Sequence, residues 1–64
     1  MEKIYKASYV VSHAAHKYMV NSYWVWDILE EQYGIIKGTN GAVLASEKKE
    51  VEEYIASEIE AGRA

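Results

Sequence analysis

Two histidines and a small group of carboxylates are the side chains whose types and spacing could support chemistry. His13 and His16 are three residues apart, so both would lie on one side of a helix and could approach the same metal ion. A structural zinc site needs about four protein ligands, and the chain has no cysteine and no third histidine. We therefore expect no metal site, and no motif indicates a bound cofactor.

The carboxylates Asp27, Glu30 and Glu31 fall within one expected helix and could in principle act as acids or bases. A charged helix face, however, is usually a solvated surface. The chain also lacks a glycine-rich phosphate-binding loop and a nucleophile paired with a convincing base. These observations indicate that the protein is not an enzyme.

The length and composition limit how the chain can be stabilised. Its 64 residues, of which 50% are hydrophobic, form a single domain, 1–64, and domains this small are marginally stable alone. Cysteine is absent, which excludes disulfides, so we expect self-association into a homodimer. No segment is apolar enough to cross a membrane, and the first residues lack the apolar segment of a secretory signal. We expect a cytoplasmic protein that does not bind membranes.

Acidic residues are concentrated towards the C-terminal end. The net charge is −3, but residues 50–64 alone contain five glutamates against the single cation Arg63. Residues 1–49 are close to neutral, with six lysines against five acids. The overall acidity therefore does not by itself exclude a nucleic-acid partner for the body of the chain.

Asn21 and Ser22 interrupt an aromatic stretch and decide how its helices are divided. Both side chains compete for backbone hydrogen bonds inside a helix, whereas they suit the start of one. We therefore predict a short helix over about 13–19, a tight turn, and a second helix over about 23–33 that Ser22 caps. Gly34 can end the second helix because glycine readily takes a left-handed backbone conformation.

The stretch after Gly34 predicts a β-hairpin. Asn40 and Gly41 form a dipeptide that favours a tight turn, and short apolar segments flank it. We place this hairpin over about 35–45. Residues 3–11 fit a helix and a strand equally well, so the sequence leaves their structure open.

A third helix is predicted within 46–62, with Ser46 as its cap and Gly62 at its end. Four apolar side chains fall close to one stripe of this helix, and glutamates occupy the other sides. The stripe either closes over the body of the chain or forms the homodimer interface, and we assign it to the interface. Its members are Val51, Tyr54, Ile55 and Ile59.

The spacing after Ala15 resembles that of helix-turn-helix DNA-binding proteins. In that family a small residue in the first helix is followed by a turn residue at position four and by apolar residues at three, five, ten and thirteen. The matching residues here are Tyr18, Val20, Val25 and Ile28, with Met19 where the family usually has glycine.

The continuation ILEEQYGIIKGTNGAVLAS is similar to the recognition helix and wing of winged-helix proteins, including small phage Cro-type and archaeal-virus-type regulators. The resemblance implies a mainly α fold with a small β-hairpin. It would consist of a helix-turn-helix over 12–33, a wing over 35–45 and the C-terminal helix over 46–62. A small α+β domain of βαββα type is the alternative.

The same resemblance implies a sequence-specific DNA-binding regulator of transcription, recombination or replication, which occupies an operator as a homodimer. Double-stranded DNA would be its partner, with the start of the second helix in the major groove. The DNA contacts implied by position are Lys17, Asn21, Ser22, Tyr23, Trp26, Lys37, Thr39 and Asn40.

A protein-binding module, such as a small inhibitor of a host protein, is the alternative function for the same fold. The presumed recognition helix carries Asp27, Glu30 and Glu31 but no arginine or lysine, whereas base recognition normally uses Arg, Asn, Gln or Ser. The arrangement of the cations distinguishes the two functions, since a DNA binder must gather them on one face. These cations are Lys3, Lys6, Lys17, Lys37, Lys48 and Lys49.

Overall fold

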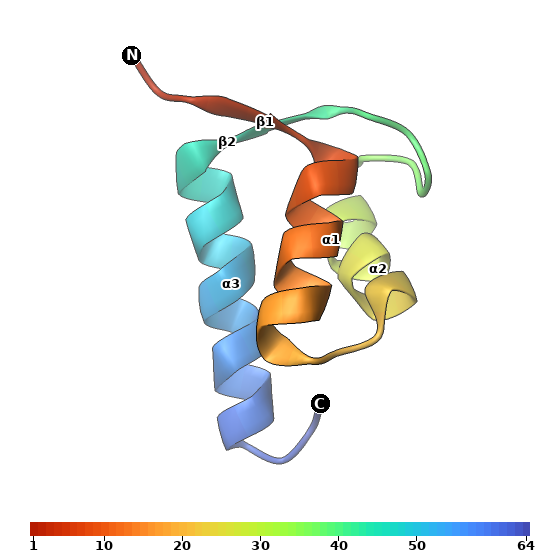
Figure 1. The fold of residues 1–64 in the computed structure, drawn as a ribbon, viewed down its shortest axis with the longest axis vertical. Helices are drawn as coiled ribbons and strands as arrows, with labels where there is room; N and C mark the ends of the chain where they lie inside the picture. The colour runs from red at the N-terminus through yellow and green to blue at the C-terminus, as the bar shows by residue number, and fades with distance from the viewer.

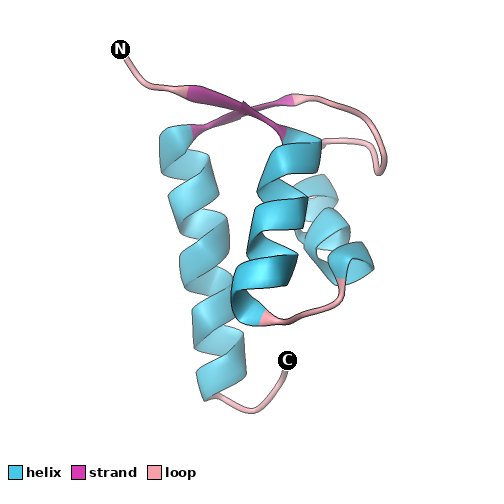
Figure 2. Ribbon diagram, viewed as in Figure 1, coloured by secondary structure: helices cyan, strands magenta, loops and turns pink.

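The computed structural model describes all residues from 1 to 64. It has three helices and one two-stranded antiparallel sheet (Figures 1 and 2). The elements are, in order, β1 (Ile4–Lys6), α1 (Ala7–Tyr18), α2 (Ser22–Tyr33), β2 (Ala42–Leu44) and α3 (Ala45–Glu60). The prediction of a mainly helical chain with a small sheet is confirmed, whereas the βαββα order is not found. None of the helices combines the length and apolar character that a membrane span requires.

The sheet joins the beginning of the chain to a segment far along it. Tyr5 pairs with Val43 at the centre of the ladder, with one further residue pair on each side. Each strand continues directly into a helix, β1 into α1 and β2 into α3. The sheet therefore holds the first turns of α1 and α3 next to each other, and both helices run away from it in the same direction (Figure 1).

Helices α1 and α2 are joined by a three-residue turn over 19–21, which agrees with the predicted pair of helices and tight turn. Met19 ends α1 in a left-handed conformation, with φ 55° and ψ 47°. It is the one residue other than glycine with a positive φ. The cap of α2 is Asn21, not Ser22, since the Asn21 side chain accepts a hydrogen bond of 2.8 Å from the Tyr23 backbone N–H.

The predicted start of the first helix at residue 13 is wrong. A short strand ends at Lys6 and α1 begins at Ala7, so residues 3–11 contain both a strand and a helix. Ala7 is fully buried, and its backbone N–H donates to the Gly41 carbonyl at 2.9 Å, which continues the sheet ladder into the first turn of the helix.

The β-hairpin predicted over 35–45 is also wrong, because β2 pairs with β1. The chain turns earlier, at Gly38, whose φ is 84°. Ile35, predicted as part of the first hairpin strand, instead joins the core. The Asn40 side chain accepts a hydrogen bond of 3.3 Å from the Ser8 backbone N–H and so caps the start of α1. With Asn40 engaged there, the Asn-Gly dipeptide does not form a hairpin turn.

The core contains only apolar side chains, and no polar or charged side chain is buried. Helix α3 contributes Val51 and Ile55, both fully buried within the single chain. These two residues of the predicted dimer stripe are therefore core residues, whereas Tyr54 and Ile59 are 44% and 41% exposed. The full core is Ala7, Val10, Val11, Ala14, Val25, Ile28, Leu29, Ile35, Val43, Val51 and Ile55.

Helix α3 begins at Ala45, so Ser46 is not its cap. The Glu47 side chain accepts a hydrogen bond of 2.9 Å from the Leu44 backbone N–H. Glu2, from the start of the chain, accepts one of 2.6 Å from the Ser46 backbone N–H. The helix ends before Gly62, as predicted, and Gly62 takes a left-handed conformation with φ 76°. Two carboxylates thus satisfy backbone donors at the positive end of this helix.

Candidate functional site

The outward side of α2 is acidic. Tyr23, Asp27 and Glu30 are exposed and spaced at three and four residues, so they follow one another along this side. Lys37, from the loop after α2, reaches the same side, where its Nζ lies 2.8 Å from Asp27 Oδ1 and 5.6 Å from the centre of the Tyr23 ring. Its hydrogen bond with Asp27 raises the pKa of Lys37 above the usual value. Lys37 is thus held by a carboxylate of α2 itself.

The predicted DNA contacts at the start of α2 are exposed, but one of them has a structural role. Asn21, Ser22 and Tyr23 all face solvent. The Asn21 Oδ1, which would have to accept a hydrogen bond from adenine, already accepts one from the Tyr23 backbone. Trp26 is half-buried against the core and is not a free surface side chain.

The predicted wing residues Thr39 and Asn40 belong to the loop that lies beside the start of α1. This is the opposite end of α1 from the turn over 19–21 (Figure 1). The Thr39 hydroxyl donates a hydrogen bond of 2.6 Å to the Ile36 carbonyl inside its own loop. Asn40 caps the first turn of α1, whereas Asn21 follows its last turn. The structure therefore places Asn21, Ser22 and Tyr23 at the start of α2, with Lys37 reaching Tyr23 from the loop after that helix, whereas Asn40 and its neighbour Thr39 lie beside the first turn of α1.

Glu52 of α3 contacts two lysines and a histidine on the side of the molecule formed by α1 and α3. Its carboxylate oxygens lie 3.4 Å from Lys17 Nζ, 2.5 Å from Lys48 Nζ and 3.8 Å from His13 Nε2. Burial alone would raise the pKa of Glu52, but Lys48 and Lys17 outweigh it and the pKa is lowered. Lys17, predicted to contact DNA, is therefore an ion-pair partner between α1 and α3.

Four of the six lysines make contacts that place them, and these four lie on different sides of the fold. Lys3 and Lys48 lie 5.1 and 5.3 Å from the centre of the Tyr5 ring, so they belong to the side formed by β1, α1 and α3. Lys17 joins them through Glu52, whereas Lys37, from the loop after α2, pairs with Asp27 of α2. Three of these four lysines therefore lie on the β1, α1 and α3 side and one lies beside α2, whereas a DNA-reading helix needs cations around its own exposed side.

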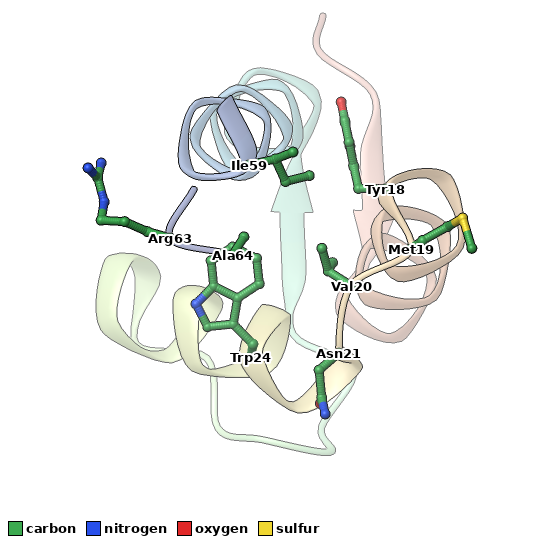
Figure 3. Close-up of a pocket in the computed structure, with 8 residues that line it drawn as sticks. All are labelled: Tyr18, Met19, Val20, Asn21, Trp24, Ile59, Arg63 and Ala64. Atoms are coloured by element: carbon green, nitrogen blue, oxygen red, sulfur yellow. The ribbon is translucent and has the colours of Figure 1, made fainter. Parts of the chain in front are cut away.

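A groove between α2 and α3, which sequence reasoning missed, has two hollows. The larger measures about 470 Å³ and lies at the end of the molecule away from the sheet, between Tyr18, Val20, Trp24, Ile59 and the chain end at Arg63 and Ala64. The side chains of Val20, Trp24 and Ile59 point towards this space, whereas Met19 points away from it (Figure 3). The smaller hollow, about 110 Å³, is lined by Ile28, Gln32, Tyr33, Glu50, Val51 and Tyr54.

Tyrosines and glutamates meet along this groove. The Tyr33 hydroxyl donates a hydrogen bond of 2.8 Å to Glu50 Oε1. Burial, followed by this hydrogen bond, raises the pKa of Tyr33 to about 12. A hydrogen bond to Glu58 likewise raises the pKa of Tyr54, to which Glu31 of α2 adds a smaller repulsion. The spacing of Tyr54 and Glu58, four residues apart on α3, is the part of this surface that is legible in the sequence.

No set of three or more histidine, cysteine, aspartate or glutamate side chains is arranged to hold a metal ion. Comparison with known proteins finds no matching family model, no matching curated protein and no matching solved structure.

Proposed function

We propose that this chain is a non-enzymatic protein-binding module that uses a helix-turn-helix arrangement without DNA, and that its partner presents a basic surface. The observation that carries this proposal is the acidic outward side of α2, where Asp27 and Glu30 are exposed and Lys37 is paired with Asp27. Carboxylates at this position repel phosphates and attract arginine or lysine side chains of another protein.

The positions of the cations also support a protein partner. A duplex-binding helix is normally flanked by arginine and lysine side chains that neutralise phosphates. Here Lys17 and Lys48 are paired with Glu52 on the α1–α3 side, away from the exposed side of α2. Approach of DNA to α2 would place its phosphates near Glu30 and Glu31 without a free cation beside them.

Fluorescence anisotropy with a labelled random-sequence DNA duplex, measured across a salt series, tests this proposal. The expected result is no binding even at about 50 mM salt, where phosphate contacts contribute most. Affinity that falls steeply as salt is raised would show release of counterions from phosphates and would overturn the proposal.

A DNA-binding regulator is the second candidate, and the backbone at Met19 favours it. The left-handed conformation falls at the position where helix-turn-helix proteins usually have glycine, and Val25 and Ile28 are buried as that motif requires. A homodimer would present two such helices to an operator. Its interface would have to use Tyr54 and Ile59, because Val51 and Ile55 lie in the core.

A further inference from the structure

We infer that the groove between α2 and α3 binds one amphipathic helix of a partner protein, with the apolar side of that helix in the groove and lysine or arginine side chains along its edges. This inference rests on the proposed protein-binding function and names the site and the partner's chemistry. The groove is defined by Trp24 and Ile28 of α2 and by Val51, Tyr54 and Ile59 of α3.

Helices α2 and α3 run in opposite directions on the two sides of the groove. Trp24, in the first turn of α2, contacts Tyr54 in the later half of α3, with ring centres 6.4 Å apart. Tyr33, at the end of α2, bonds to Glu47 and Glu50 near the start of α3. Side chains of the two helices therefore meet at both of these places, and a partner helix would lie over the outer side of the groove.

The two hollows supply places for apolar side chains. The Trp24–Tyr54 contact lies between the larger hollow at Ile59 and the smaller one at Ile28 and Val51. Tyr54 and Ile59 remain 44% and 41% exposed, so apolar surface is left uncovered beside the hollows. An amphipathic helix places apolar side chains in one line, and it can insert one into each hollow.

The edges of the groove are acidic, and this selects a basic partner. Glu50 of α3 accepts a hydrogen bond from Tyr33, one of the two groove tyrosines, and Glu58 of α3 and Glu31 of α2 both raise the pKa of the other, Tyr54. Arg63 is the cation beside them, and it is paired with Glu58. A bound helix with lysine or arginine beside its apolar face would meet carboxylates from both walls, whereas an acidic helix would be repelled.

The test uses a fluorescein-labelled synthetic peptide of about 14 residues, near the length at which isolated helices begin to form, with leucines on one face and lysines on the other. A matched peptide replaces every lysine by glutamate. Fluorescence anisotropy measures both affinities, and the tryptophan emission of a Trp26→Phe variant, in which Trp24 is the remaining tryptophan, reports on the groove itself. We expect saturable binding of the lysine peptide and binding at least tenfold weaker for the glutamate peptide.

Matched variants separate groove binding from general attraction to an acidic protein. The double variant Glu31→Gln/Glu50→Gln removes two charges at the groove, and Glu53→Gln/Glu60→Gln removes two from exposed positions elsewhere on α3. We expect the groove variant to weaken lysine-peptide binding about fivefold and the control variant to weaken it less than about twofold.

An aromatic pair of variants tests the apolar contact. Tyr54→Ala removes a groove wall, and Tyr9→Ala removes a tyrosine of similar exposure on α1, 49% against 44%. We expect about a tenfold loss of affinity for Tyr54→Ala alone, and circular dichroism confirms that each variant is folded. Equal effects from groove and control variants would overturn the inference, as would failure of the lysine peptide to bind.

Labelled duplex DNA in the same buffer distinguishes the two failures. If neither the duplex nor the lysine peptide binds, the groove inference is overturned while the proposed function is not. Salt-dependent binding of the duplex overturns the proposed function itself.

Discussion

Met19 is held in a conformation that its side chain disfavours. It has a φ of 55° and is 91% exposed, so its side chain contributes little packing in return. Met19→Gly should raise the free energy of unfolding by about 0.5–1 kcal/mol, because relief of the left-handed strain exceeds the entropy that glycine adds to the unfolded chain. Urea denaturation measures this change. The control Met19→Ala retains the strain and should not raise the free energy of unfolding. A Met19→Gly variant less stable than the parent protein would contradict the assigned turn.

Glu52 makes stability depend on acid pH. Its pKa in the folded protein is lowered from the usual 4.5, since Lys48 and Lys17 outweigh the opposing effect of burial. A lowered folded-state pKa contributes stability that is present above the unfolded pKa and is lost as pH falls through the folded one. Glu52→Gln should therefore lower the free energy of unfolding by about 1 kcal/mol at neutral pH, and this difference should shrink below pH 4.5.

Thermal unfolding monitored by circular dichroism between pH 3 and 7 measures the effect of Glu52, with about ±0.5 kcal/mol as the range expected for a surface control. Glu53→Gln is that control, since Glu53 is the exposed neighbour. If the difference in the free energy of unfolding between Glu52→Gln and the parent protein stayed constant across this pH range, the ion pairs of Glu52 would not be the cause of the loss of stability in acid.

At the scale of elements, Tyr33 ties the end of α2 to the start of α3. Its pKa is raised from 10.0 to about 12 by burial and then by its hydrogen bond to Glu50. A raised folded-state pKa gives stability that is complete below the unfolded pKa and is lost as pH rises towards the folded one. The protein should thus lose stability from pH 10 towards about 12, and Tyr33→Phe should lose less over that range.

Chemical denaturation at several alkaline pH values tests the role of Tyr33. Tyr33→Phe should also cost about 0.5–1.5 kcal/mol at pH 7, the usual contribution of one hydrogen bond. Tyr9→Phe on the exposed side of α1 is the control and should follow the parent protein. An unchanged alkaline profile for Tyr33→Phe would exclude the assigned link between the two helices.

Charge reversal on α2 tests whether its carboxylates are what prevent DNA binding. Glu30→Lys/Glu31→Lys places two cations on the exposed side of α2, and Glu53→Lys/Glu60→Lys makes the same change on α3. We expect the α2 variant to gain salt-dependent duplex affinity and to exceed the α3 variant by about tenfold, because α2 starts at the exposed turn. Equal gains in anisotropy titrations would mean that α2 has no special geometry for DNA.

For the whole molecule, local sequence preferences predicted the pair of helices and its turn, whereas the sheet depends on pairing between segments that are far apart in the sequence. Asn21 and Gly34 mark the start and the end of α2 through backbone preferences that act within a few residues, and the structure has α2 between them. The sheet depends instead on Tyr5 meeting Val43, nearly 40 residues later, and no local preference reports such a contact. Asn40-Gly41 favoured a hairpin locally, but capping of α1 by Asn40 prevailed.

The candidate site was predicted less well than the fold, because a surface depends on which side of each helix is covered. The stripe on α3 was recognised, but its division into buried Val51 and Ile55 and exposed Tyr54 and Ile59 depends on how α3 packs against the rest of the chain. The acidic character of α2 was legible in the sequence. The groove was not, because it exists only once Trp24 and Tyr54 are brought together.

The most direct test of the account is a pair of nuclear magnetic resonance titrations of the ¹⁵N-labelled protein, one with the lysine–leucine peptide and one with a DNA duplex. We predict that the peptide shifts the amide signals around Trp24, Ile28 and Tyr54 and the Trp24 indole signal, and that the duplex shifts none. Duplex-induced shifts centred on Asn21 and Tyr23, with the groove signals unchanged by the peptide, would contradict the account and identify α2 as a DNA-reading helix.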